Sequence, residues 1–163
     1  MPDAQPSALP TVGEVLGPIV AKVAPEQQPL LIALAERIAA GRYRAWADQA
    51  GDSARRARLL ACADREEEVA RRVEALFADA AEVQADLLAQ YACLEEIYRG
   101  LFDGRPVADQ FTIQAQGERL GAATWRSFAQ RTRDDVARKT YLDCADLEED
   151  SAVVLEDLVR TGP

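Results

Sequence analysis

The chain has 163 residues, of which 48% are hydrophobic, 29% charged and 6% aromatic, a composition typical of one globular domain. Its 28 acidic and 19 basic side chains give a formal charge of −9, which repels phosphate backbones and anionic lipid headgroups. A chain with no His cannot carry Ser-His-Asp or Cys-His catalysis or a His-ligated zinc site. We therefore expect no nucleic acid and no membrane as partner.

The N-terminal part is rich in proline, with Pro2, Pro6, Pro10, Pro18 and Pro25 in the first 25 residues. We expect a flexible leader over residues 1–25, in which residues 12–23 form a short helix. This segment lacks the basic start and the small-residue cleavage site of a signal peptide, and the chain has no apolar run of the roughly 18 to 20 residues that span a membrane. The expected location is the cytoplasm.

Residues 26–163 are rich in Ala, Leu, Glu and Arg, which are strong helix formers. The pattern predicts four long helices and one crossover helix between the second and the third. Asp52 or Ser53 is the expected N-cap of the second long helix, and Asp134 or Asp135 that of the fourth. The predicted ranges are 26–50, 53–80, 107–131 and 134–160 for the long helices and 83–101 for the crossover helix, which ends at the turn 102–106.

An internal repeat relates the two halves of this region. Residues 35–76 align without a gap with residues 117–158, an offset of 82 residues, and 16 of the 42 aligned positions are identical. The period is far longer than the roughly 20 to 50 residues of a solenoid unit. We therefore interpret the repeat as a duplicated helical hairpin, and two hairpins predict an all-α, antiparallel four-helix bundle.

Four of the repeated residues are glutamates on apolar helix faces. Glu36 precedes Glu66 by 30 residues, and Glu118 precedes Glu148 by the same 30. At 100° per residue each glutamate shares a stripe with Ala, aromatic or Cys side chains, so all four should face the interior. Each hairpin thus brings two carboxylates to a similar height.

The doubled pattern resembles the ferritin-like di-metal carboxylate family and is most similar to its rubrerythrin branch. That branch repeats one Glu, about thirty residues and then Glu-x-x-His-Ala, and this chain has Glu36 before Glu66-Glu67-Glu68-Val69-Ala70 and Glu118 before Glu148-Glu149-Asp150-Ser151-Ala152. Val69 and Ser151 occupy the two His positions. The resemblance implies two Fe or Mn ions on Glu36, Glu66, Glu118 and Glu148, and oxygen or peroxide chemistry of a non-haem di-metal oxidoreductase with an unidentified electron donor.

The buried charge has a second interpretation that needs no metal. Ionised carboxylates inside a protein require a cation, a proton or an ion pair. Repeated arginines near each glutamate could supply the ion pair, namely Arg44, Arg126, Arg56 and Arg138. The alternative function is therefore a metal-free ferritin-like bundle that serves as a structural or interaction protein, and a homodimer over the crossover helix is the expected assembly.

Other repeated side chains lie close to the glutamates on the helix surface. Cys62 and Cys144 each precede a glutamate by four residues, so they are candidate soft ligands or a redox pair, while close packing is the commoner role of such cysteines. Tyr43 and Trp125 lie two turns from Glu36 and Glu118, where an aromatic ring either relays an electron or fills the core. Ser151 is a further candidate near the metal. We expect Cys93 to be a packing residue.

Overall fold

The computed structural model describes residues 8–162 and is all-helical over them. Two of its helices lie in the N-terminal half as a hairpin, α2 (Gln28–Gln49) and α3 (Ser53–Glu74), and two in the C-terminal half, α6 (Val107–Arg131) and α7 (Asp135–Thr161). Three shorter helices complete the fold: α1 (Val12–Val20), α4 (Ala80–Gln90) and α5 (Leu94–Phe102). Residues 1–7 of the leader predicted over residues 1–25 lie outside the described part of the chain.

Side-chain caps start three of these helices, α1, α3 and α7. Thr11 and Glu14 form a reciprocal capping box at the start of α1. The side chain of Asp52 accepts a hydrogen bond from the Arg55 amide, and Asp134 accepts from the amides of the first turn of α7. These two aspartates are the caps, rather than Ser53 and Asp135, because a side-chain oxygen at the N-cap satisfies amides that have no partner within the helix.

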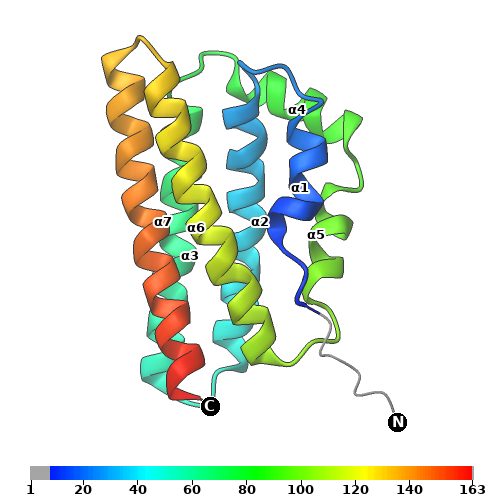
Figure 1. Cartoon of the computed structure of the whole chain (residues 1–163), viewed down its shortest axis with the longest axis vertical. Coiled ribbons are helices and arrows are strands. Elements are labelled where there is room, and N and C mark those ends of the chain that lie inside the picture. Colours follow the sequence, from blue (N-terminus) through cyan, green and yellow to red (C-terminus); the bar gives the residue numbers. More distant parts are fainter. Residues whose placement is uncertain (1–7, 163) are drawn as a thin grey trace.

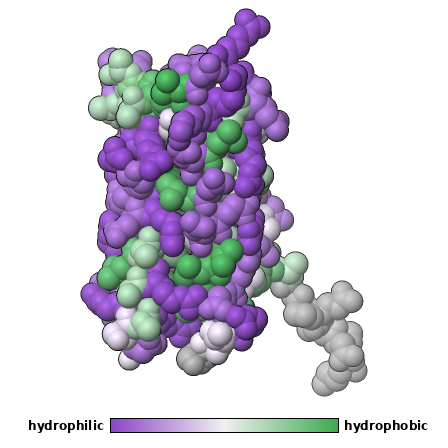
Figure 2. All heavy atoms as spheres, turned by 90° about the vertical axis from the view of Figure 1, so that its left-hand side faces the viewer, coloured by the Kyte–Doolittle hydropathy of each residue, from purple (hydrophilic) through white to green (hydrophobic). Residues whose placement is uncertain are grey.

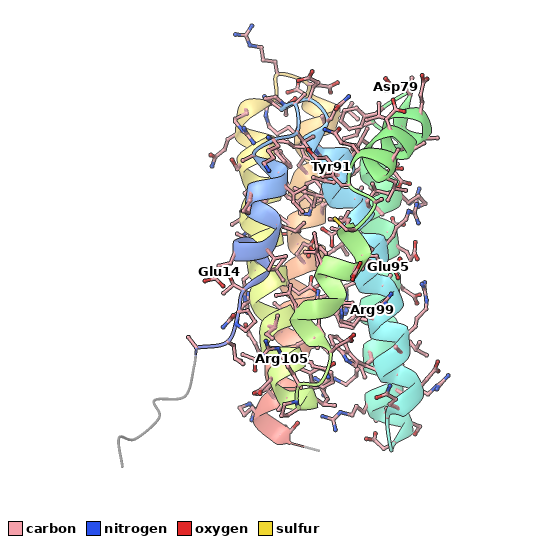
Figure 3. All side chains as sticks on the ribbon, turned by 90° about the vertical axis from the view of Figure 1, so that its right-hand side faces the viewer. Glu14, Asp79, Tyr91, Glu95, Arg99 and Arg105 are labelled. Carbon is pink, nitrogen blue, oxygen red and sulfur yellow. The ribbon has the colours of Figure 1, made fainter. Side chains whose placement is uncertain are left out.

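The four long helices lie side by side along the molecule, and the closest pairs are α2 with α3, α3 with α7, and α6 with α7 (Figure 1). On the remaining side, between α2 and α6, the shorter helices cover the interior. Helix α1 contacts α5 and α6, and α5 also contacts α6. Figure 3 views this side, with α1 and α5 in front of the long helices. The interior is therefore enclosed by the long helices on three sides and by α1 and α5 on the fourth.

Close packing of α1 on α6 depends on two glycines. A Cβ atom on Gly117 of α6 would stand 2.9 Å from Val12 Cγ2, and one on Gly13 of α1 would stand 3.0 Å from Leu120 Cδ2. Real side-chain contacts are longer than this, so any larger residue would move the two helices apart. Residues 12–20 of the N-terminal segment thus pack closely against α6 and belong to the folded domain, and are not only a leader.

The crossover differs from its prediction. A single helix was expected at 83–101, but the chain turns at Tyr91–Cys93 and forms α4 and α5. Helix α4 packs on α2, whereas α5 packs on α1 and α6, and no straight helix reaches both partners. Helix α3 also ends at Glu74, six residues before the predicted end, in a turn that places Phe77 against the core. Cys93 is exposed, so its predicted packing role was wrong.

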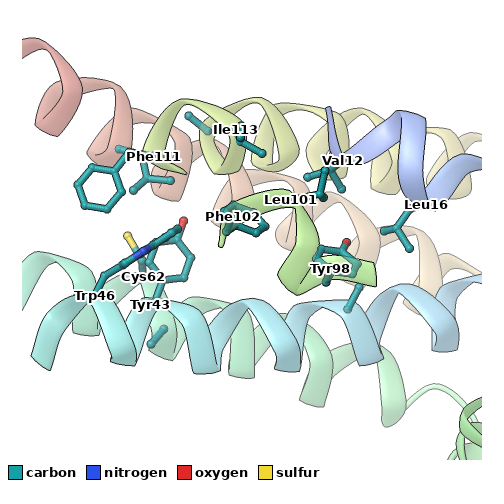
Figure 4. Close-up of a cluster of buried hydrophobic side chains, with 14 of the residues drawn as sticks. Val12, Leu16, Tyr43, Trp46, Cys62, Tyr98, Leu101, Phe102, Phe111 and Ile113 are labelled. Carbon is teal, nitrogen blue, oxygen red and sulfur yellow. The ribbon is translucent and has the colours of Figure 1, made fainter. Parts of the chain in front are cut away.

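Aromatic rings fill the core on both sides of the glutamates. One set joins Trp46 to Tyr43, Phe102 and Phe111 with ring centroids 5.0 to 6.0 Å apart (Figure 4). The other set joins Trp125 to Phe128 and Tyr141 at 5.7 and 5.8 Å. Such pairs add to the stability that burial of the rings provides. The rings fix the helices from which the polar side chains of the interior project.

The outer surface over α7 is mostly hydrophilic, with separate hydrophobic patches (Figure 2). None of the helices among residues 8–162 combines the length and the apolar character that crossing a membrane requires.

Candidate metal centre

All four predicted glutamates are buried at the centre of the long helices. Glu36 on α2 is 8% exposed, Glu66 on α3 and Glu118 on α6 are each 1% exposed, and Glu148 on α7 is 2% exposed. Charged side chains are almost never this buried unless something compensates their charge. The inward-facing stripes predicted from the repeat are therefore present in the structure.

Three of the four carboxylates converge on one point. One oxygen from each of Glu36, Glu66 and Glu148 lies within 4.8 Å of the other two. Glu118 is outside this trio, but it lines the same internal cavity as Glu36 and Glu148. Oxygens at this separation repel one another when ionised, and they can share a cation or a proton between them.

The pKa values reflect that crowding. Burial, and then the negative charge of Glu118, raises the pKa of Glu36 from 4.5 to about 7. Burial together with the surrounding carboxylates also places the pKa of Glu66 and of Glu148 well above the usual range. Without a cation, these three carboxyl groups therefore hold protons at a pH where exposed glutamates are ionised.

Each hairpin supplies hydrogen-bond donors to particular carboxylates. The Tyr43 hydroxyl and the Gln114 amide both donate to Glu118 Oε1 at 2.7 Å. Trp125 Nε1 donates to Glu148 Oε1 at 2.8 Å, and the Ser151 hydroxyl donates to Glu66 Oε1 at 3.1 Å. Tyr43 and Trp125 thus pack in the core, as expected, and also orient the carboxylates.

Glu66 has one oxygen without any donor. Its Oε2 atom is buried and has no hydrogen-bond partner within residues 8–162. Buried polar atoms are nearly always bonded, and an orphan of this kind calls for an ion, a water or a proton. The atom belongs to a carboxylate of the converging trio, so a cation bound by that carboxylate could satisfy it.

A glycine makes the room in which the Glu148 carboxylate lies. A Cβ atom on Gly121 would stand 3.0 Å from Glu148 Oε2 and 3.1 Å from its Cδ. The repeat places Ala39 at the equivalent position in the first hairpin. Gly121 and Trp125 are four residues apart on one face of α6, so together they hold Glu148 against that helix.

The four arginines predicted to pair with the buried glutamates bind other partners. The prediction of a buried Glu–Arg network was therefore wrong. Arg44 donates to Glu67 and Arg126 to Glu149, two glutamates on the outer faces of α3 and α7. Arg56 binds the Ala47 carbonyl and Asp48, and Arg138 binds the Thr132 carbonyl and Asp135, at the ends of the hairpins. These four arginines lie on the solvent-facing sides of their helices. There both members of an ion pair stay hydrated, whereas a pair with a buried carboxylate would lose that hydration.

Two polar residues of the interior were missed by the sequence analysis. Gln114 lies four residues before Glu118 on the same face of α6, and Arg42 donates to Gln114 Oε1 at 3.2 Å. Arg42 lies over the Phe102 ring at 3.6 Å, and burial lowers its pKa to about 10. The spacing of Gln114 from Glu118 was a signal, but Gln114 lies outside the aligned residues 117–158, so the repeat did not reveal it.

The two buried cysteines lie in different hydrophobic clusters, and the Cys62 sulfur also accepts a hydrogen bond from Arg65 Nη1 at 3.4 Å. Cys62 belongs to the cluster around Trp46, and Cys144 to the cluster around Trp125, and both are free thiols. Burial raises the pKa of Cys62 to about 11 and that of Cys144 to about 12. A protonated thiol is a poor ligand and a poor nucleophile. These surroundings favour the packing role.

The donor set of the centre consists of oxygen atoms: glutamate carboxylates with a serine hydroxyl beside them. Such a set suits hard cations such as Mn²⁺, Fe²⁺ or Mg²⁺, and the orphaned Glu66 oxygen fits a metal at this place. Comparison of the chain with protein-family models, curated proteins and solved structures finds no match. The functional assignment therefore rests on the geometry of the site itself.

Proposed function

We propose that the protein is a ferritin-like four-helix bundle that binds two hard divalent cations, Mn²⁺ or Fe²⁺, on Glu36, Glu66, Glu118 and Glu148. The observation that carries the proposal is the buried trio of carboxylates within 4.8 Å of one another, one of whose oxygens has no partner in the described chain. Four ionised carboxylates carry a charge that two divalent cations balance, and Arg44 and Arg126 pair with other glutamates.

The chain's own residues would prepare the site for these ions. Tyr43 and Gln114 hold the Glu118 carboxylate by its Oε1 atom, and Trp125 holds Glu148 by its Oε1 atom. Donors of this kind orient carboxylate ligands and tune their basicity. When bound, Fe or Mn would supply Lewis-acid and one-electron redox chemistry toward oxygen or peroxide. The aromatic and aliphatic core around the glutamates would exclude bulk water from that chemistry.

Thermal unfolding of untagged, metal-free protein with and without MnCl₂ tests the proposal. A ligand that binds only the native state stabilises it, by about 2.7 kcal/mol at a concentration one hundred times its Kd. We expect Mn²⁺ to raise the Tm by several degrees in the native sequence and not in Glu66→Gln. The matched control is Glu67→Gln, because Glu67 is the next residue but pairs with Arg37 and Arg44 on the outside. Equal Tm values with Mn²⁺, Fe²⁺, Mg²⁺ and Zn²⁺ would contradict the proposal and leave a metal-free interaction protein.

A further inference from the structure

A cavity of about 360 Å³ lies beneath α1 on the side where α2 and α6 are covered by the short helices. Its size is at the lower end of the roughly 300–1,000 Å³ of small-molecule sites. Aliphatic side chains from three helices form most of its wall, namely Val12, Leu16, Val20, Ile32 and Leu120. A molecule that fills it would need an apolar body.

The inner end of this cavity is the carboxylate centre. Glu36, Glu118 and Glu148 all line it, and no Lys or Arg is among its lining residues in the described chain. A negatively charged head group would therefore meet carboxylates without a compensating cationic side chain. An acid or a phosphate ester is a poor fit, and an uncharged head group is a better one.

Tyr98 marks where such a head group would bind. Its side chain lines the cavity from α5 and is 4% exposed. Figure 4 shows its ring opposite Val12 and Leu16 of α1. Buried tyrosine hydroxyls usually find a partner. A ligand oxygen in the cavity would provide one.

We propose that this cavity binds a small molecule with an unbranched apolar body and one uncharged oxygen head group, such as a primary alcohol or an aldehyde. The body lies along α1, and the head group accepts a hydrogen bond from the Tyr98 hydroxyl beside the carboxylates. The inference deepens the proposed function, because it rests on the same carboxylate centre and names the class of molecule that reaches it.

The test is an NMR titration of the ¹⁵N-labelled, metal-free protein with primary alcohols from butanol to octanol. We expect the amides of α1 to shift, and the affinity to rise about fourfold for each methylene group until the cavity is full. Octanoate should bind far more weakly than octanol. Tyr98→Phe should weaken octanol binding by about two- to tenfold, the range for one lost hydrogen bond.

A pair of glycine variants locates the binding site. Gly17 lies at the centre of the lining face of α1, and a Cβ atom added there meets nothing within 4 Å, so Gly17→Leu extends a side chain into the cavity. Gly100 on α5 also has open space around an added Cβ but is not part of the cavity. Octanol binding should be lost in Gly17→Leu and kept in Gly100→Leu.

The outcomes separate this inference from the proposed function. Octanoate or octylamine binding more tightly than octanol would overturn the assigned head group, and unchanged octanol binding in Gly17→Leu would overturn the assigned cavity. Cation binding without alcohol binding contradicts the cavity proposal alone. Alcohol binding by a chain that binds no cation supports the cavity and contradicts the metal centre.

Discussion

The two hairpins of the molecule are alike on the outside and different on the inside. On the outside each hairpin has the same group of ion pairs. One arginine pairs with two glutamates of the neighbouring helix, and a second arginine pairs with the first of these two glutamates. In the first hairpin Arg37 pairs with Glu67 and Glu74, and Arg44 pairs with Glu67. In the second hairpin Arg119 pairs with Glu149 and Glu156, and Arg126 pairs with Glu149. The outer pairing follows the repeat residue by residue.

Inside, three equivalent positions differ and change the surroundings of the carboxylates. The first hairpin has Ala39, Tyr43 and Val69 where the second has Gly121, Trp125 and Ser151. Tyr43 donates across to Glu118 of the other hairpin, whereas Trp125 donates to Glu148 of its own. Repeated residues therefore build the frame, and the residues that differ decide which carboxylate receives hydrogen bonds.

Stability against pH should show the raised pKa of Glu36. The pKa of Glu36 is raised from 4.5 to about 7 in the folded state, so its contribution to stability is fully present below about pH 4.5 and lost as the pH rises through 7. We expect metal-free protein to be more stable at pH 5 than at pH 8, by roughly 3 kcal/mol from this group alone. Urea unfolding at both pH values measures the difference.

Glutamine variants sharpen that comparison. Glu36→Gln should reduce the pH dependence, of which the part from Glu66 and Glu148 remains, and should stabilise the metal-free protein at pH 8, because no buried charge is then required at this position. Glu118→Gln should destabilise it, since Tyr43 and Gln114 lose a charged acceptor. The same sign for both variants would show that the two carboxylates are equivalent.

The difference between Gly121 and Ala39 should appear in metal affinity. Gly121→Ala places a Cβ atom 3.0 Å from Glu148 Oε2, so the carboxylate must move, and we expect Mn²⁺ affinity to fall about tenfold or more. The reverse change, Ala39→Gly, should leave the affinity unchanged and lower stability by about 1 kcal/mol through helix propensity. Equilibrium Mn²⁺ titration measures both, and equal affinities would refute the role of Gly121.

Ser151 should matter more than an exposed serine of the same hairpin. Ser151→Ala removes the hydroxyl that donates to Glu66 Oε1, and the expected loss in urea unfolding of metal-free protein at pH 8 is about 1 kcal/mol. Ser127→Ala makes the same change at an exposed position of α6 and should have almost no effect. Similar values for the two variants would remove Ser151 from the site.

The outer ion pairs should show the smallest and most equal effects. Arg37 and Arg119 have side chains that are each 42% exposed, so solvent screens their pairs. We expect Arg37→Ala and Arg119→Ala each to lower the unfolding free energy by no more than about 1 kcal/mol, and by equal amounts. Clearly different losses of unfolding free energy in the two variants would show that the two groups of ion pairs do not contribute equally to stability.

The repeat predicted what the hairpins share, and this includes much of the fold. The four long helices and the four buried glutamates were predicted, and the caps of the second and fourth long helices were narrowed to Asp52 or Ser53 and to Asp134 or Asp135. These features follow from helical periodicity and capping, which depend on nearby residues alone.

The same reasoning could not find what lies outside the repeat or differs within it. Tyr98 is in the crossover, Gln114 lies outside the aligned residues 117–158, and Gly121 has Ala39 as its equivalent. The turn at Tyr91–Cys93 carries no Gly or Pro, and it arises because α4 and α5 pack on different helices. Each of these features depends on tertiary contacts that no local pattern encodes.

Metal content is the most direct test of the central claim that the buried carboxylates form a cation site. Untagged protein would be expressed with added iron and manganese, desalted, and measured by elemental analysis beside the Glu66→Ala, Glu148→Ala double variant. The account predicts about two Fe or Mn per chain in the native sequence, the number that balances four carboxylates, and none in the folded variant. Negligible metal in both proteins would contradict it.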